Sequence, residues 1–110
     1  MVQYQTIDQT LAAIADPTRR AVLEHLGHGP ATITELAEPL GISLTGTKKA
    51  VQVLEEAELV TTVKSGRARI CRLGPRRLDE VDVFISAYRR MLDSQLDRLG
   101  ELLEQPKGEQ

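Results

Sequence analysis

A short run near the middle of the chain carries side chains that could recognise a nucleic acid. On a helix that follows Ser43, the polar residues share one face at about 100° per residue, and they are Thr45, Lys48, Lys49, Gln52, Glu55 and Glu56. Lysine can reach phosphate or guanine, and glutamine can pair with adenine through two hydrogen bonds. Hydroxyl and basic groups precede the acids, which is typical of a helix that enters a DNA groove by its N-terminal end. On this helix alone, an ordinary solvated face is an equal alternative.

The opposite face of the same run supplies the packing of the predicted helix. Ser43 is a suitable N-cap, because its hydroxyl can accept a hydrogen bond from an unpaired backbone N–H group. The small and apolar residues of the run gather away from the lysines, and they are Gly46, Thr47, Ala50, Val51, Val53, Leu54 and Ala57.

Length and composition indicate one domain with an aliphatic core. The chain has 110 residues, with one Phe, two Tyr and no Trp, and this length supports a single core. No run reaches the roughly 18 apolar residues of a membrane span, and the first residues lack the basic and apolar regions of a signal peptide. The single cysteine cannot form an internal disulfide, so a reducing cytoplasm is expected.

Charge is distributed unevenly along the chain. The formal net charge is −2, but residues 1–42 carry −3, residues 43–77 carry +5 and residues 78–110 carry −4. The basic middle third contains the helix described above. Such a local concentration matters more for phosphate binding than the total charge does.

Three predicted helices precede the basic run. Apolar spacing predicts a first helix from about Gln5 to Ala15, and Asp16-Pro17 then caps a second helix that ends at Gly27. Thr32 and Glu35 form a capping box for a third helix. Gly41-Ile42 makes a turn before Ser43, so residues 32–57 read as a helix-turn-helix.

Residues 60–73 are predicted to form a basic β-hairpin. Two runs rich in β-branched and alternating residues flank a turn at Ser65-Gly66. The hairpin contains no acid, and its basic residues are Lys64, Arg67, Arg69 and Arg72. Because it follows a helix-turn-helix, it is predicted to be the wing of a winged-helix domain; the alternative is a charged, solubilised edge hairpin.

A long helix is predicted from about residue 78 to 105. One stripe of apolar side chains runs along it, and its members are Val81, Phe84, Ile85, Tyr88, Leu92, Leu96, Leu99 and Leu103. A domain this small cannot cover the whole stripe, so a twofold homodimer is expected, with Ile7 and Leu11 of the first helix as neighbours in the interface. The predicted fold is mainly α with a small β-hairpin, as one winged-helix domain over residues 1–105, followed by a disordered tail at 106–110.

Several stretches together resemble the ArsR/SmtB-type winged helix-turn-helix repressors, in their SdpR-like branch. The stretches are Leu11–Arg20, which ends in Ala-Asp-Pro-Thr-Arg-Arg, then Thr34–Ser43, Val53–Val60, Gly66-Arg67 and Cys71–Leu73. The resemblance implies a cytoplasmic transcriptional repressor that binds double-stranded DNA. It also implies a homodimer whose two recognition helices enter successive major grooves of an inverted repeat.

The resemblance departs from the family pattern at three positions. Thr47 replaces a β-branched or similar apolar residue, which predicts lighter packing under the recognition helix. Ala50 stands where relatives often have His. Glu58 replaces a glycine that ends the helix, which predicts a strained or different helix exit.

No metal or cofactor site is predicted. The third predicted helix lacks Cys, and the last lacks His and Cys, so the thiolate and imidazole ligands of the family's metal sensors are missing. The remaining candidates, His25, His28 and Cys71, belong to separate elements. The two histidines are interpreted as surface or helix-end residues. Cys71 is interpreted as a small core or wing residue, although nearby arginines could lower its pKa and make it redox-active.

The predicted DNA contacts fall on the helix and the wing. Thr45, Lys48, Lys49 and Gln52 are assigned to the major groove, and Ser43 and Thr32 to phosphates through backbone N–H groups. Arg67 and Arg69 are assigned to the DNA backbone or the minor groove. Arg19 and Arg20 are interpreted as surface ion-pair partners.

Two further interpretations remain beside the repressor. A winged-helix protein-interaction module that has lost DNA binding, or a repressor responding to redox through Cys71, would fit the same elements. A small-molecule or protein effector is left open. An enzyme is not expected, because no nucleophile–base set shares an element and no phosphate-binding glycine loop is present.

Overall fold

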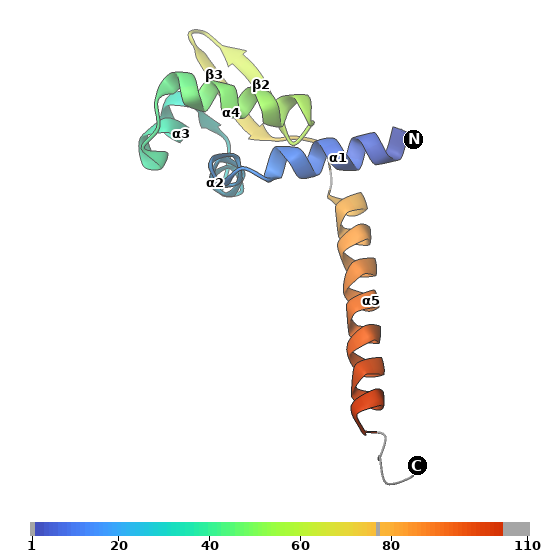
Figure 1. Cartoon of the computed structure of the whole chain (residues 1–110). Coiled ribbons are helices and arrows are strands. Elements are labelled where there is room, and N and C mark those ends of the chain that lie inside the picture. The colour runs from blue at the N-terminus through green and yellow to red at the C-terminus, as the bar shows by residue number, and fades with distance from the viewer. Residues whose placement is uncertain (1, 77, 105–110) are drawn as a thin grey trace. The chain divides into compact units, whose positions relative to one another are not determined.

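The computed structural model describes residues 2–76 and 78–104, with side chains from residue 7 onward (Figure 1). Its contacts group the chain into two compact units, Met1–Arg77 and Leu78–Gln110, and the single winged-helix domain over residues 1–105 stays a prediction. In order, the elements are α1 (Val2–Ile14), α2 (Pro17–Leu26), β1 (Ala31–Thr32), α3 (Ile33–Leu40), α4 (Leu44–Glu56), β2 (Val60–Ser65), β3 (Ala68–Leu73) and α5 (Asp79–Glu104).

The predicted caps of α2 and α3 and the turn that ends α3 are confirmed. The Asp16 side chain accepts a hydrogen bond from the Arg19 N–H at the start of α2. Thr32 and Glu35 form the capping box of α3, and Gly41 ends that helix in the left-handed conformation at φ 67°. These residues act on their own local backbone, which is why the sequence alone could place them. Helix α1 begins at Val2, earlier than expected.

The wing belongs to a three-stranded antiparallel sheet with strand order β1-β3-β2. The hairpin is confirmed, with Val60 opposite Leu73 at its base and Ser65 opposite Ala68 at its tip. The sequence missed β1, in which Ala31 pairs with Cys71 and Thr32 with Ile70. A strand of two residues has no alternation that a sequence pattern could reveal.

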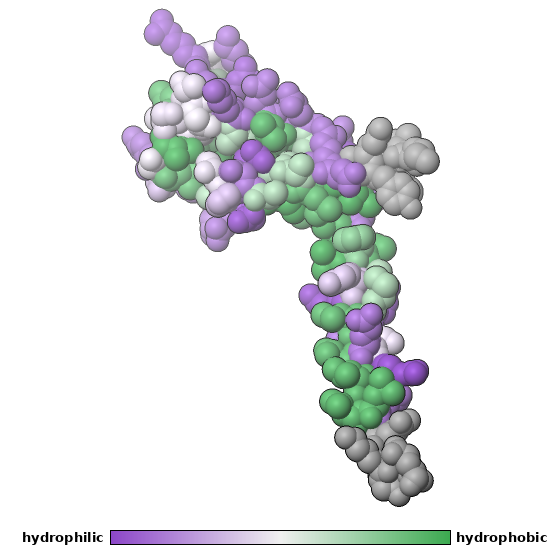
Figure 2. Space-filling model, viewed as in Figure 1, coloured by the Kyte–Doolittle hydropathy of each residue, from purple (hydrophilic) through white to green (hydrophobic). Residues whose placement is uncertain are grey.

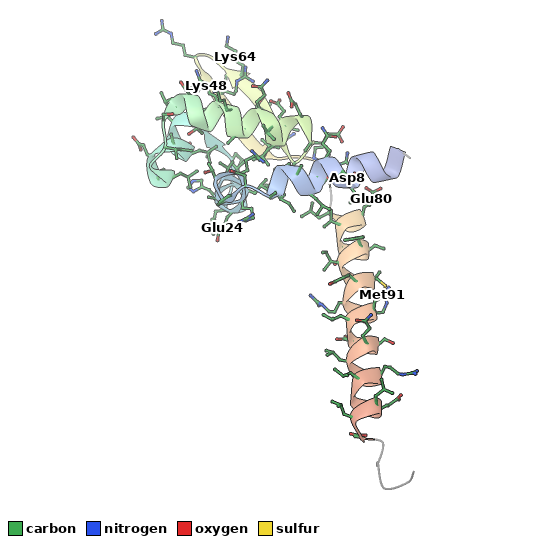
Figure 3. The ribbon with its side chains drawn as sticks, in the orientation of Figure 1. Asp8, Glu24, Lys48, Lys64, Glu80 and Met91 are labelled. Atoms are coloured by element: carbon green, nitrogen blue, oxygen red, sulfur yellow. The ribbon has the colours of Figure 1, made fainter. Side chains whose placement is uncertain are left out.

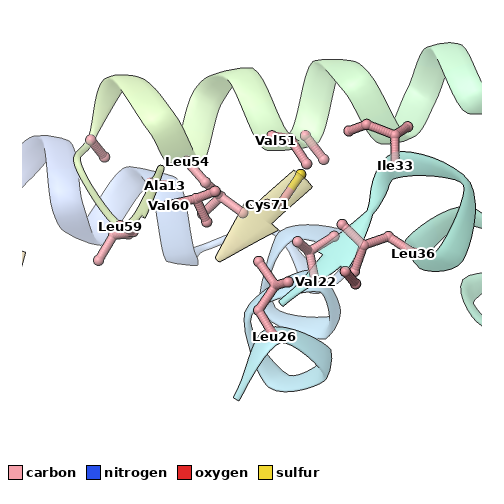
Figure 4. Packing of buried hydrophobic residues seen from close by; sticks show 13 residues of the cluster. Ala13, Val22, Leu26, Ile33, Leu36, Val51, Leu54, Leu59, Val60 and Cys71 are labelled. Carbon is pink, nitrogen blue, oxygen red and sulfur yellow. The ribbon is translucent and has the colours of Figure 1, made fainter. Parts of the chain in front are cut away.

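The core of the first unit lies between α4, the sheet and the helices α2 and α3 (Figure 4). Its largest fully buried side chains come from five elements, and they are Val22, Leu36, Thr47, Leu54, Val60 and Cys71. The core is therefore aliphatic, as the composition predicted. Since each of these elements contributes to one cluster, α4 and the wing are held on a common support.

The end of α4 has the strained backbone that the sequence predicted for a helix exit at Glu58. Glu58 has φ 64°, and it is the one non-glycine residue with positive φ in the described part of the chain. Its N–H donates to the Glu55 carbonyl oxygen and the next N–H, of Leu59, to the Leu54 carbonyl oxygen, both at 2.9 Å. This is the hydrogen-bond pattern of a glycine-type helix end, adopted here by a glutamate.

The second unit is the helix α5, which begins at Asp79 and ends at Glu104, close to the predicted bounds. Residue 105 and the predicted disordered tail at 106–110 lie outside the described residues. None of the described α5 side chains is buried, and the apolar residues lie along its length (Figure 2). Among the described helices, none combines the length and the apolar content needed to cross a membrane.

Candidate nucleic-acid interface

Helix α4 presents its polar face to solvent because its other face enters the core. Thr47, Ala50, Val51 and Leu54 are buried, and the Thr47 hydroxyl donates to the Ser43 carbonyl oxygen at 2.8 Å. Thr47 is fully buried, so it fills its place in the core. Val53 was predicted on the buried face, but this was wrong: its side chain is 37% exposed, at the edge of the apolar face.

The predicted contact residues of α4 are all on the surface. The Ser43 hydroxyl accepts from the Gly46 N–H at 2.9 Å, which starts the helix and leaves the first turn open to solvent. The exposed side chains are Thr45, Lys48, Lys49 and Gln52. Lys48 extends from the same side of this unit as Lys64 of the wing, and Glu24 lies on the other side (Figure 3). Hydrophilic residues gather over the same side in the space-filling view (Figure 2).

A groove of about 370 Å³ separates the start of α4 from the wing. We call it the basic groove, because Lys48, Arg67 and Arg69 line it from two elements. Thr32, at the start of α3, completes the group of predicted residues that the groove brings together. The sequence missed the other four lining residues, which are Ile33, Thr34, Leu44 and Ala68. Leu44 is half exposed directly after the N-cap, a position from which the helix geometry could have predicted it.

The other predicted residues of α4 lie outside the basic groove. Gln52 lines an adjoining hollow of about 310 Å³ that also contains Lys48, Glu55 and Arg69. Lys49 lines a third hollow of about 300 Å³, beside Asp16 and Arg19 of the α2 start. The polar face of α4 therefore borders the wing along one side and α2 along the other.

Thr32 already uses its backbone N–H group. That group donates to Glu35 Oε1 at 2.9 Å, and the Thr32 hydroxyl accepts from the Glu35 N–H at 3.1 Å. The predicted phosphate contact through this N–H would have to displace Glu35. The hydroxyl hydrogen of Thr32 is the donor that the capping box does not use.

A chain of hydrogen bonds that the sequence did not indicate joins α4 to the wing. The Thr62 hydroxyl donates to Glu55 Oε2, and Arg69 Nη1 donates to the Thr62 hydroxyl oxygen, each at 2.9 Å. The pairing of a hairpin that turns at Gly66 could have placed Thr62 and Arg69 on one face. The contact with Glu55 depends on how α4 packs on the sheet.

Cys71 is a core residue. Its side chain is fully buried on β3, in the cluster that contains Val51 and Leu54. Burial raises the pKa of the Cys71 thiol above its ordinary value, although the Arg69 guanidinium lowers it; the Glu55 carboxylate adds to the rise. The predicted lowering of this pKa by nearby arginines is therefore wrong in its net direction, and the thiol is kept protonated and out of solvent.

His25 and His28 lie at the end of α2 and just after it, apart from Cys71 on β3. Over residues 2–76 and 78–104, no group of three or more His, Cys, Asp or Glu side chains is placed to hold a metal ion.

Arg19 and Arg20 differ from their predicted role as ion-pair partners. Arg19 donates to the carbonyl oxygens of Ala13 and Ala12 at 2.6 and 2.9 Å, and Arg20 donates to that of Ile14 at 2.9 Å. The last carbonyl groups of a helix have no partner within it. The two arginines supply those partners and fasten α2 to the end of α1.

Comparison with known proteins agrees with this arrangement. A family described as a helix-turn-helix domain matches residues 14–63. The HTH-type transcriptional regulator Rv2034 of Mycobacterium tuberculosis is 34% identical over 105 residues, covering 88% of this chain and 98% of the relative. The transcriptional repressor SdpR of Bacillus subtilis is 31% identical over 61 residues, covering 56% and 68%. The crystal structure of the ArsR family transcriptional regulator RHA00566 is 34% identical, with a TM-score of 0.73 over 82% of this chain and 93% of that one.

Proposed function

The chain belongs to the ArsR family of winged helix-turn-helix DNA-binding transcriptional regulators, and from this we propose that it is a repressor that binds an inverted-repeat operator as a homodimer. Helix α4 is the recognition helix, and the hairpin of β2 and β3 is the wing. The proposal goes beyond the family in naming the mode of binding and the residues that carry it.

The observation that carries the proposal is the basic groove. Lys48 of α4 and Arg67 and Arg69 of the wing line one hollow, so one side of the molecule offers cations from two elements. DNA phosphates are the ligand that such an arrangement favours, because each neutralised phosphate releases condensed counterions. The N-terminal half of α4 would enter the major groove, where Lys49 and Gln52 reach base edges and Thr45 and Ser43 reach bases or phosphates.

The homodimer is proposed from the exposed apolar side of α5. Phe84, Tyr88, Leu92, Leu96 and Leu99 are each between 44% and 57% exposed, and they follow helical spacing over more than four turns. A second copy would cover this stripe with its own, and the partly buried Ile7 and Leu11 of α1 would extend the interface. The twofold axis would then set two recognition helices about one DNA turn apart, roughly 34–36 Å.

Fluorescence anisotropy tests the proposal directly. The full chain is titrated into labelled duplex from the DNA upstream of its own gene, with a scrambled duplex of equal composition as competitor, over a series of salt concentrations. We expect two chains per duplex, preference over the scrambled sequence, and a steep loss of affinity with salt. If the upstream duplex binds no better than the scrambled duplex, the operator lies elsewhere. The operator would then be identified by selecting bound duplexes from a random-sequence library.

Neutralising Lys48 and Lys49 distinguishes a DNA-binding repressor from a protein-interaction module that does not bind DNA. In a repressor, Lys48→Gln combined with Lys49→Gln removes four cations per dimer, and DNA affinity should fall at least about a hundredfold. An interaction module would keep its dimer and show no DNA binding to lose. Arg90→Gln is the matched control, since it removes an exposed cation from the side of α5 opposite the apolar stripe.

A further inference from the structure

Thr62 is the middle member of the hydrogen-bonded chain that joins the recognition helix to the wing. Its hydroxyl donates to the Glu55 carboxylate on α4 and accepts from the Arg69 guanidinium on β3, both at 2.9 Å. A neutral hydroxyl thus stands between a negative and a positive group. Both charged ends polarise it in the same direction, which strengthens the two bonds together.

The register of the hairpin explains why these groups meet. Thr62 lies opposite Cys71, and Arg69 precedes Cys71 by two residues, so the three side chains share one face of the sheet. Cys71 is fully buried, so this is the face that packs on the core and on α4. Arg69 extends from that face into the basic groove, where it lies with Lys48.

Glu55 has no evident role in a surface that binds phosphate, because a carboxylate repels it. It nevertheless lines the hollow that contains Lys48, Gln52 and Arg69. Its place is explained if it acts through Thr62 on the guanidinium. An exposed arginine samples many rotamers, and fixing it during binding costs conformational entropy that prior ordering avoids.

We propose that Glu55 and Thr62 are positioning residues that hold the Arg69 side chain in the basic groove, ready for a DNA phosphate. The bond to Thr62 uses one donor of Nη1, and the guanidinium keeps further N–H donors for the phosphate. This inference rests on the proposed function, since it takes DNA as the ligand. Thr62 carries no charge, so a Thr62 variant should lose DNA affinity because its Arg69 side chain is no longer held in place.

The test uses the full chain and a labelled duplex of about 30 base pairs, selected from a random-sequence library with the unmodified protein. DNA affinity is measured over a salt series for Thr62→Val, Arg69→Ala and the double variant. Valine keeps the shape of threonine and favours strands, and thermal unfolding by circular dichroism checks that each variant folds. Thr62→Ala removes the same hydroxyl if Thr62→Val does not fold.

We expect Thr62→Val to weaken binding about fivefold per protomer, the cost of ordering one flexible side chain on binding. Because each protomer then loses a phosphate contact, the slope of log affinity against log salt should fall by up to about 2 per dimer, as with Arg69→Ala. In the double variant, Thr62→Val should add no further loss. Thr62→Ser keeps the hydroxyl and should retain the original slope.

Thr61→Val is the matched control. Arg72 Nε donates to the Thr61 hydroxyl at 3.2 Å, the same kind of cross-strand bond on the opposite face of the wing. This variant should bind as the unmodified protein does. If Thr62→Val leaves the slope unchanged, or if its effect multiplies with that of Arg69→Ala, the positioning role is overturned while the repressor stands. Failure of the unmodified protein to select any duplex overturns both.

Discussion

Arg19 closes the end of α1: its Nε donates a hydrogen bond of 2.6 Å to the backbone carbonyl oxygen of Ala13. A second bond, from Nη2 to the Ala12 carbonyl oxygen at 2.9 Å, makes the contact two-pronged. Since α1 ends at Ile14 and α2 begins at Pro17, one side chain fastens two successive helices. Arg19 thereby connects α1, which we propose contributes to the dimer interface, to α2, which packs on α3 and α4.

Arg19→Ala should therefore destabilise the protein. Two carbonyl groups lose a charged donor, and the expected decrease in the free energy of unfolding is about 1.5–2 kcal/mol. Urea denaturation followed by circular dichroism measures it. Arg20→Ala is the comparison, because Arg20 is exposed and makes one such bond, to Ile14. A decrease for Arg20→Ala equal to that for Arg19→Ala would count against this account.

Glu58→Gly should stabilise the protein relative to Glu58→Ala. Both variants lose the ion pair with Arg76, whose Nη2 lies 3.2 Å from Glu58 Oε1. Only glycine relieves the left-handed backbone at φ 64°, which costs a residue with a Cβ atom about 1 kcal/mol. Urea denaturation should place the glycine variant about 1 kcal/mol above the alanine variant. Equal stabilities would show that this helix end carries no strain.

Local and long-range features differed in how well the sequence predicted them. Asp16, Thr32 and Gly41 act on backbone within a few residues, so their roles followed from residue type alone. The partners of Arg19 are backbone carbonyl oxygens, which carry no residue identity and leave no pattern. The Glu55–Thr62 contact was missed for another reason, because it depends on the packing of α4 against the sheet. The lysines and arginines predicted to contact DNA are all exposed, but only the structure separates those in the basic groove from Lys49 beside α2.

Cys71 should react slowly with thiol reagents in the folded protein. Its side chain is fully buried and burial raises its pKa, so both access and thiolate are lacking. Reaction with a chromogenic disulfide reagent near pH 8 should be slow in buffer and fast in urea. Fast reaction in buffer, with loss of DNA binding, would instead favour the redox-responsive repressor.

The same raised pKa predicts how stability depends on pH. As pH rises past the ordinary thiol pKa, the unfolded state releases its proton before the folded state does. The stability that Cys71 contributes is thus present below the unfolded pKa and is lost as pH rises toward the folded value. The difference in unfolding free energy between the unmodified protein and Cys71→Ala should therefore shrink between neutral and alkaline pH. A difference that grows over this range would contradict the direction of the shift.

Leu96→Glu should separate the proposed dimer into monomers. Leu96 is 57% exposed in the single chain and lies in the α5 stripe, so the second copy would bury a charge at this position without a partner. Sedimentation velocity measures the mass, and anisotropy measures DNA affinity, which should fall about a hundredfold or more because each half-site is then bound alone. Arg90→Glu changes the charge on the opposite side of α5 and should remain dimeric. If Leu96→Glu stays dimeric while binding DNA normally, the interface lies elsewhere, and the exposed stripe of α5 has another occupant.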